Sequence, residues 1–170
     1  MAVTQKSLED RIRAIEDRLE IYDLIARHPP SADTGATEYT RTVWVEDGVF
    51  DRQIAAAHGR EEIAAGVATP AHRAAIEGGI GHFVGLPAIA IDGDTAVVIN
   101  YLQILVPQTQ GEPVEVANHG ASKGYRVHRF SANRWELVRI DGRWKVARRL
   151  LRVIDGSEPA RELLRGAVTA

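Results

Sequence analysis

The chain has 170 residues, of which 45% are hydrophobic and 26% are charged, and its formal net charge is −2. This length and composition are typical of one soluble globular domain with its own hydrophobic core. The near-neutral charge gives no general attraction to nucleic acid or to an anionic membrane. The sequence contains no cysteine, which excludes disulfides, thiolate nucleophiles and cysteine-bound metals.

The first six residues are polar and lack the apolar segment of a signal peptide. No apolar run in the sequence approaches the length that a membrane-spanning helix needs. We therefore expect a cytoplasmic protein whose partners include neither nucleic acid nor a membrane.

The first predicted element is a long amphipathic helix with Ser7 as its N-cap. Pro29 and Pro30 are predicted to end this helix, because proline lacks the backbone N–H of a helical residue. Apolar residues recur at intervals of three and four and predict one buried helix face, formed by Leu8, Ile12, Ile15, Leu19, Tyr22 and Ile25.

Shorter elements are predicted after the prolines. A second helix is expected over residues 36–45, with Trp44 facing inward, and a short strand over residues 49–51. Residues 58–68 are predicted to form a helix with a glycine near its start. Pro70 is predicted to begin a further short helix.

The apolar spacing changes to that of strands from Gly81 onward. Residues 92–94 and the pair Asp141 and Gly142 are typical hairpin turns between long strands. Residues 108–112 are predicted to form a polar loop, and residues 157–170 a loose C-terminal tail.

Helices followed by long strands predict the α+β class, with a single domain over residues 1–170 and its core within residues 8–156. One curved antiparallel sheet wrapped around the N-terminal helices would leave a cavity. We expect the functional site inside that cavity.

Two residues within these elements suggest chemistry. Asp33 lies in the loop after the first helix, and His82 opens an apolar strand. A carboxylate that orients a neutral imidazole makes a general base. Asp33 is equally suited to cap the next helix, and a lone histidine at a strand start more often has a structural role. The residues alone leave both interpretations open.

Several blocks of the sequence resemble SnoaL-like proteins of the nuclear-transport-factor-type cone fold. Residues 131–149, with Trp135, the Asp141 turn and Trp144, resemble the closing hairpin of these domains. Residues 22–25, the loop aspartate, residues 49–51 and residues 59–63 resemble their N-terminal half. The resemblance covers residues 8–156 and implies a cone-shaped, curved antiparallel sheet around N-terminal helices.

Within this superfamily, the resemblance suggests that the nearest chemistry is that of scytalone dehydratase, bile-acid 7α-dehydratase and hexachlorocyclohexane dehydrochlorinase. These enzymes pair a loop aspartate with a strand histidine, and the matching positions here are Asp33 and His82. The resemblance therefore implies a cofactor-independent lyase, of dehydratase or dehydrohalogenase type, that acts on a small hydrophobic ring substrate.

The resemblance also suggests which residues bind the substrate. His28 stands five positions before the aspartate, where the relatives have a lysine or a tyrosine, and Arg149 aligns with a basic residue on the last strand of the dehydrochlorinase. Side chains alternate along a strand, so only one residue of each neighbouring pair can face the cavity. The full expected set is His28, Arg149, Tyr22, Trp44, Phe83, Asn100, Tyr101 and Ile104.

Other functions remain open at this point, because this superfamily contains lyases, isomerases, cyclases, hydrolases and noncatalytic binders. One alternative is an isomerase or polyketide-type cyclase that uses the same base, and another is a noncatalytic small-molecule-binding module. The remaining histidines have no metal-binding spacing, so we expect no metal and no cofactor. Members of the superfamily commonly form dimers or trimers, and we expect a homo-oligomer with the final hairpin as its interface.

Overall fold

The computed structural model describes residues 7–168 of the chain, and over these residues the protein forms five helices and nine strands. The first six residues and the last two of the expected tail lie outside the described range. The helices are α1 (Leu8–Asp33), α2 (Thr37–Val43), α3 (Arg60–Gly66), α4 (Pro70–Glu77) and α5 (Glu158–Arg165). The strands are β1 (Trp44–Asp51), β2 (Ala56–His58), β3 (Gly81–Val84), β4 (Ala88–Asp92), β5 (Thr95–Pro107), β6 (Val114–Val116), β7 (Gly120–Ser122), β8 (Tyr125–Ile140) and β9 (Arg143–Val153).

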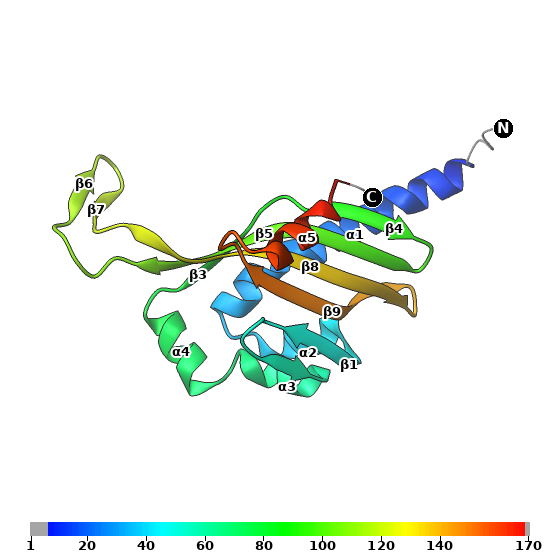
Figure 1. Ribbon diagram of the computed structural model, residues 1–170, viewed down its shortest axis with the longest axis horizontal. Helices are drawn as coiled ribbons and strands as arrows, with labels where there is room; N and C mark the ends of the chain where they lie inside the picture. Colours follow the sequence, from blue (N-terminus) through cyan, green and yellow to red (C-terminus); the bar gives the residue numbers. More distant parts are fainter. Residues whose placement is uncertain (1–6, 169–170) are drawn as a thin grey trace.

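Seven strands form one curved, unclosed sheet in the order β2-β1-β9-β8-β5-β3, with β4 also paired to β5 (Figure 1). All of these pairs are antiparallel except β1 with β9, which is parallel. Register shifts interrupt the ladders of β5 with β8 and of β8 with β9, and such bulges strengthen the local twist of a sheet. The curved, mainly antiparallel sheet with helices at the N-terminus confirms the predicted α+β cone fold.

The core lies between α1 and the concave face of the sheet. Ile21 and Ile25 of α1 pack with Val98, Trp135 and further buried residues of β5, β8 and β9. Each fully buried side chain of this size contributes about 1.5–3 kcal/mol to folding. Helix α5 covers part of the opposite face and lies in front of β8 in Figure 1, with α1 behind the sheet.

Helix α1 begins as predicted but does not end at the prolines. The Ser7 hydroxyl accepts a hydrogen bond from the Asp10 backbone N–H, and the Asp10 carboxylate accepts one from the Ser7 backbone N–H, which completes a capping box. The helix continues through Pro29 and Pro30 to Asp33. The φ of proline is itself helical, and the turn after the prolines is held by the N–H and hydroxyl of Thr34, which both donate to the Pro30 carbonyl.

The prediction for the buried face of α1 is wrong up to Tyr22 and is confirmed only for Ile25. The residues that form the predicted face are exposed up to Tyr22, which is 41% accessible, whereas Ile21, Leu24 and Ile25 are buried. The helix is oriented by Asp17, whose carboxylate accepts hydrogen bonds from Arg139 on β8 and from the Trp144 indole on β9. The exposed apolar stripe consists of Leu8, Ile12, Ile15, Leu19 and Tyr22.

The short elements after α1 agree with the sequence in kind and differ in their bounds. Trp44 is buried, as expected, but it begins β1 and does not end a helix. The strand expected over residues 49–51 is longer, because β1 runs from Trp44 with a register shift before Val49. Helices α3 and α4 lie where the residues around Gly59 and Pro70 predict them.

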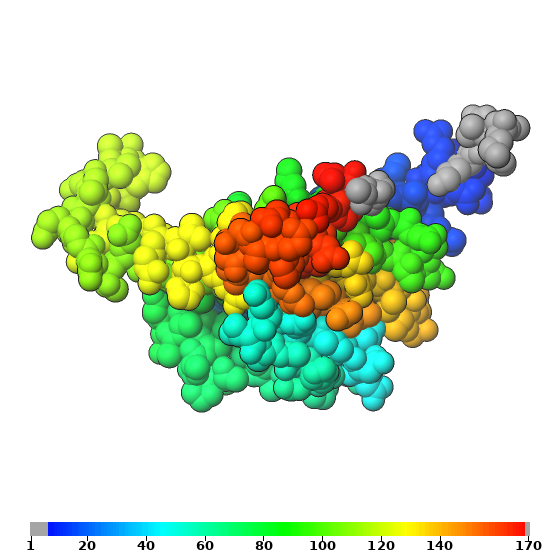
Figure 2. Space-filling view, in the orientation of Figure 1, coloured from blue at the N-terminus to red at the C-terminus, as the bar shows by residue number. Residues whose placement is uncertain are grey.

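Both predicted hairpins are present, and one further hairpin was not predicted. Asp141 and Gly142 have φ of 51° and 74°, as their tight turn between β8 and β9 requires. Residues 108–124 form a projecting arm that contains the small sheet of β6 and β7. Figure 2 shows this arm at the opposite end of the molecule from the start of α1.

The C-terminal residues 158–165 form helix α5, where a loose tail was expected. Ala160 is buried, and a Cβ on Gly166 would lie 2.9 Å from Ile99 Cδ1, so this segment packs closely on the outer face of the sheet. None of the described helices is long and apolar enough to cross a membrane.

Candidate active site

A cavity of about 460 Å³ lies between the concave face of the sheet and helices α3 and α4. Leu102, Ile104 and Leu151 provide apolar side chains from the sheet, and Ile63 and Val67 face them from α3 and the residue after it. A largely apolar cavity with a few convergent polar groups is the usual form of a small-molecule site. The titratable residues among those that line it are His28, Arg52, Glu62, His72, His82, Arg129 and Arg149.

Asp33 and His82 are in direct contact. Asp33 is the last residue of α1, His82 lies on β3, and these two elements pack side by side. Asp33 Oδ1 lies 2.6 Å from His82 Nδ1, and Asp33 Oδ2 accepts the His82 backbone N–H at 3.0 Å. The N-cap of α2 is Ala36, without a side-chain hydrogen bond. Asp33 therefore binds His82 and does not cap α2.

This contact determines where the proton of His82 lies. A carboxylate only accepts hydrogen bonds, so the neutral imidazole carries its proton on Nδ1 and keeps a lone pair on Nε2. Burial lowers the pKa of His82, and Arg149 and His72 lower it further, whereas Asp33 opposes the shift. His82 lines the cavity as an imidazole that is neutral at pH 7 and able to accept a proton.

A second cavity histidine, His72, lies in the first turn of α4. Its Nε2 lies 2.8 Å from the carbonyl oxygen of Ala32, which can only accept, so Nε2 carries the proton. The His72 ring lies 6.3 Å from the His82 ring, measured between centroids. This contact could not be predicted from the sequence, because it depends on how α4 folds back against the end of α1.

Arg149 is almost completely buried, with 1% of its surface accessible. Its Nη1 donates to His28 Nε2 at 2.5 Å, and its guanidinium carbon lies 4.0 Å from the centre of the Trp135 ring and 4.7 Å from that of Phe50. Its Nη2 is buried without a hydrogen-bond partner. Among residues 7–168, no carboxylate forms an ion pair with it.

Burial dominates the electrostatics of this pair. It lowers the pKa of the partly buried His28 well below the ordinary value, and the adjacent Arg149 cation lowers it further. Burial also lowers the pKa of Arg149, yet a guanidinium remains protonated in proteins. The arrangement is a neutral His28 beside an uncompensated buried cation, which favours an anion or a developing negative charge nearby.

Two asparagines fix the position of Arg149. Asn133 Oδ1 accepts a hydrogen bond from Arg149 Nε at 2.9 Å, and Asn133 Nδ2 donates to Asn100 Oδ1 at 2.8 Å. The Trp135 indole also donates to Asn100 Oδ1. Asn100, expected as a substrate contact, therefore belongs to the hydrogen-bond network behind Arg149 and does not line the cavity.

The remaining predicted site residues have different positions. Ile104 lines the cavity, and Trp44 lines a small adjoining recess that also includes His28 and Arg149. Tyr101 stacks on Phe130 on the opposite face of the sheet, as strand alternation requires once Asn100 faces inward. Phe83, 59% accessible, points away from the cavity for the same reason, since His82 faces it. Tyr22 belongs to the exposed stripe of α1 and is also outside the cavity.

The sequence of residues 13–150 matches the model of the SnoaL-like domain. The chain belongs to the SnoaL-like family. No curated protein is significantly similar in sequence. Family membership confirms the resemblance on which the positions of Asp33 and His82 were assigned, whereas the activity of the protein does not follow from it.

Solved structures show the same fold. An NTF2-like protein with a cystatin-like fold from Novosphingobium aromaticivorans is 37% identical, covers 92% of this chain and 94% of its own, and has a TM-score of 0.81. ActVI-ORFA from Streptomyces coelicolor is 19% identical over 83% of this chain and 97% of its own, with a TM-score of 0.65. A provisionally assigned scytalone dehydratase from Novosphingobium aromaticivorans is 20% identical over 83% of this chain and 85% of its own, with a TM-score of 0.60. At the identities of the last two, the likeness shows the fold alone.

Proposed function

We propose that the protein is a cofactor-independent lyase of dehydratase or dehydrohalogenase type that acts on a small hydrophobic ring substrate. The observation that carries this proposal is the 2.6 Å contact between Asp33 and His82 at the edge of an apolar cavity. General base catalysis by a positioned histidine contributes typically about 10²–10⁴-fold to a rate.

In the proposed reaction, His82 Nε2 takes a proton from a carbon of the substrate. The electron pair of that C–H bond forms a C=C bond with the neighbouring carbon, whose hydroxyl or halide leaves with its bonding electrons. Asp33 keeps the proton of neutral His82 on Nδ1 and stabilises the imidazolium that forms. In a dehydration, the proton on Nε2 can then pass to the departing hydroxide and give water.

Arg149 is the group that we assign to the developing negative charge. Its buried Nη2 has no hydrogen-bond partner, so it can donate to a departing anion or to a carbonyl oxygen that becomes an enolate. His28 accepts from Nη1 and so holds the guanidinium in place. The apolar surface of Leu102, Ile104 and Leu151 suits a ring substrate.

The test is turnover by His82→Ala and Asp33→Asn on ring compounds that carry a hydroxyl or halide next to an acidic C–H bond. We expect the wild-type protein to release water or hydrogen halide, and both variants to be slower by at least about 100-fold. His128→Ala is the matched control, because His128 is exposed and outside the cavity. Full activity in either site variant contradicts the proposed base.

Product mass separates the lyase from the alternatives that use the same base. Loss of water or hydrogen halide means elimination, whereas a product of unchanged mass means an isomerase or a simple cyclase. A binding module would hold the ring compounds without changing them. Nitrogen NMR of the histidine rings adds a test without substrate, because Asp33→Asn should weaken the preference of His82 for the Nδ1–H form.

We also propose that the protein is a homo-oligomer. The support is the apolar stripe of α1, defined above, which includes Leu8 at 69% and Leu19 at 63% exposure. Contiguous exposed apolar surface of this kind marks protein contacts. This location differs from the final hairpin that the sequence suggested as the interface.

A further inference from the structure

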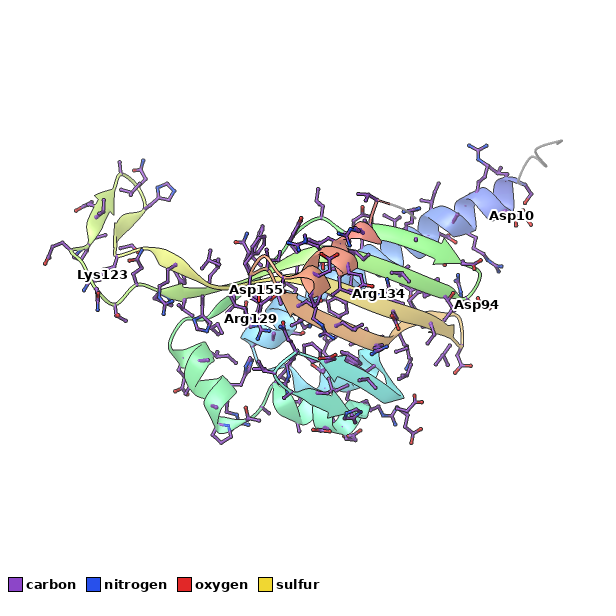
Figure 3. The ribbon with its side chains drawn as sticks, in the orientation of Figure 1. Asp10, Asp94, Lys123, Arg129, Arg134 and Asp155 are labelled. Carbon is purple, nitrogen blue, oxygen red and sulfur yellow. The ribbon has the colours of Figure 1, made fainter. Side chains whose placement is uncertain are left out.

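Arg52 and Arg129 are two further cations of the cavity that the proposed elimination does not use. Both residues line the cavity, and the Arg129 Nη2 donates to the Arg52 carbonyl oxygen at 3.0 Å, which places the two residues together. The Nε atoms of both guanidiniums are buried and have no hydrogen-bond partner. Figure 3 labels Arg129 where β8 leaves the body of the sheet toward the arm.

The described residues supply no counterion for these two arginines. Neither forms an ion pair with a carboxylate of residues 7–168. Asp51, the immediate neighbour of Arg52, is paired with Arg152 at 2.7 Å. Glu62 is the one carboxylate among the residues that line the cavity, and its Oε2 accepts the His58 backbone N–H at 2.8 Å. Arg52 and Arg129 therefore share one cavity without a carboxylate partner among the described residues, and this arrangement favours the binding of a negatively charged group.

The backbone holds Arg52 at this place with a tight turn after β1. Gln53 has a φ of 72°, a conformation uncommon for residues other than glycine. The turn is fixed by the Asp51 carboxylate, which accepts the Gln53 N–H, and by the Gln53 side chain, which accepts the Val153 N–H. The guanidinium carbon of Arg52 lies 5.5 Å from the centre of the Phe50 ring, so the side chain follows the cavity wall.

The sheet register relates Arg129 to the proposed base. His82 pairs with Ile104, and Ile104 pairs with Arg129, so these three side chains stand in one row on one face of the sheet. Neighbouring strands are about 4.8 Å apart, which puts the Cα atoms of His82 and Arg129 about 10 Å apart. A ring placed over Ile104 can therefore meet His82 at one edge and the arginines at the other.

We infer that the substrate carries an oxyanion, a carboxylate or a phosphate, which Arg52 and Arg129 bind while the ring lies against His82. Guanidinium groups match both oxyanions because their N–H donors can bind two oxygens at once. The inference names the substrate class of the proposed lyase and rests on that function for the chemistry. The binding of the oxyanion does not depend on the base, so the two can be tested separately.

The test is calorimetric binding of naphthoate, naphthamide and naphthyl phosphate, which share one ring system and differ in the polar group. We expect the wild-type protein to bind naphthoate or naphthyl phosphate at least about tenfold more tightly than naphthamide. The better of the two anions identifies which oxyanion the site prefers. Arg52→Gln and Arg129→Gln should each remove most of this preference and leave naphthamide binding unchanged.

Arg148→Gln is the matched control, because Arg148 is an exposed arginine on the opposite face of β9. Arg148→Gln removes the same charge as Arg52→Gln or Arg129→Gln and should leave the affinities for all three compounds unchanged. Equal binding of the anions and the amide by the wild-type protein overturns the inference. The inference is also overturned if Arg52→Gln or Arg129→Gln weakens naphthamide binding as much as it weakens the binding of the anions. His82→Ala should keep the preference for the anion. A preference for the anion in His82→Ala would support the oxyanion site even if the protein proved not to catalyse elimination. The oxyanion site and the lyase activity can therefore be disproved independently.

Discussion

His28 is partly buried beside the Arg149 cation, and this position makes the free energy of unfolding depend on pH. Burial and Arg149 both lower the pKa of His28 in the folded protein. Between that lowered pKa and about 6.5, the unfolded chain binds a proton at this residue and the folded chain does not. The contribution to stability is fully present above pH 6.5 and is lost as the pH falls below it.

The expected slope is about 1.4 kcal/mol of unfolding free energy per pH unit for each such histidine. His82 acts in the same direction, because burial lowers its pKa too. Urea unfolding at pH 7.5 and pH 5.5 should show a smaller loss of stability for His28→Gln than for the wild-type protein. Comparison of slopes removes any uniform destabilisation by the substitution. Parallel pH curves for the two proteins would contradict the lowered pKa of His28.

At the residue scale, the sequence predicted those site residues whose positions match residues of the family that it resembles. Asp33 and His82 were assigned by matching positions, and their side chains meet. Arg52, His72 and Arg129 belong to no sequence motif. Their positions in the cavity depend on the turn after β1, on the packing of α4 and on the sheet register, respectively, and no local pattern predicts these. Strand alternation alone could show that Asn100 and Tyr101 face opposite sides, but not which side is the cavity.

At the element scale, Asp17 decides how α1 lies on the sheet. Its carboxylate oxygens lie 2.5 and 2.6 Å from the guanidinium of Arg139, and it also accepts the Trp144 indole N–H. The Arg139 hydrogen bond is the main cause of the lowered pKa of Asp17. Arg139 in turn lies over the Trp144 ring, 4.6 Å from its centre. The helix is therefore anchored by one ion pair that is largely shielded from water.

Asp17→Asn should lower the free energy of unfolding by about 2 kcal/mol, because it leaves the largely buried Arg139 cation with only the exposed Asp94 carboxylate as an ionic partner. Glu16→Gln, on the exposed side of the same turn, is the control and should change the stability by less than about 0.5 kcal/mol. Urea unfolding measures both. Equal stability of the two variants would mean that apolar packing alone orients α1.

The elements that the sequence predicted well are those with strong local chemistry. Asp141 with Gly142, the Ser7 cap and Pro70 each favour one backbone geometry, and the turn or helix start appears there. The periodicity of α1 predicted a helix but selected the wrong face for all of its residues up to Tyr22, because it does not show what covers the apolar side. The last turns of α1 continue past Pro29, since contacts after the prolines stabilise them.

At the scale of the whole molecule, the apolar stripe of α1 is the surface that supports the proposed homo-oligomer. It continues along five residues of one helix, and the start of that helix lies at one end of the molecule in Figures 1 and 2. A second copy of the chain is the partner that we propose, because a self-complementary contact between two identical helices buries both stripes at once.

Light scattering after size exclusion should give the wild-type protein a mass of two or more chains. Ile12→Glu and Leu19→Glu should each shift it toward one chain, because a buried carboxylate without a partner opposes association. Ile140→Glu places the same charge on the final hairpin, where Ile140 is 41% accessible. If only the hairpin variant dissociates the protein, the interface lies on β8 and β9, and a monomeric wild-type protein would contradict the oligomer itself. Because the stripe lies outside the cavity, the dissociated variants should keep the binding of naphthoate, and this result would separate assembly from function.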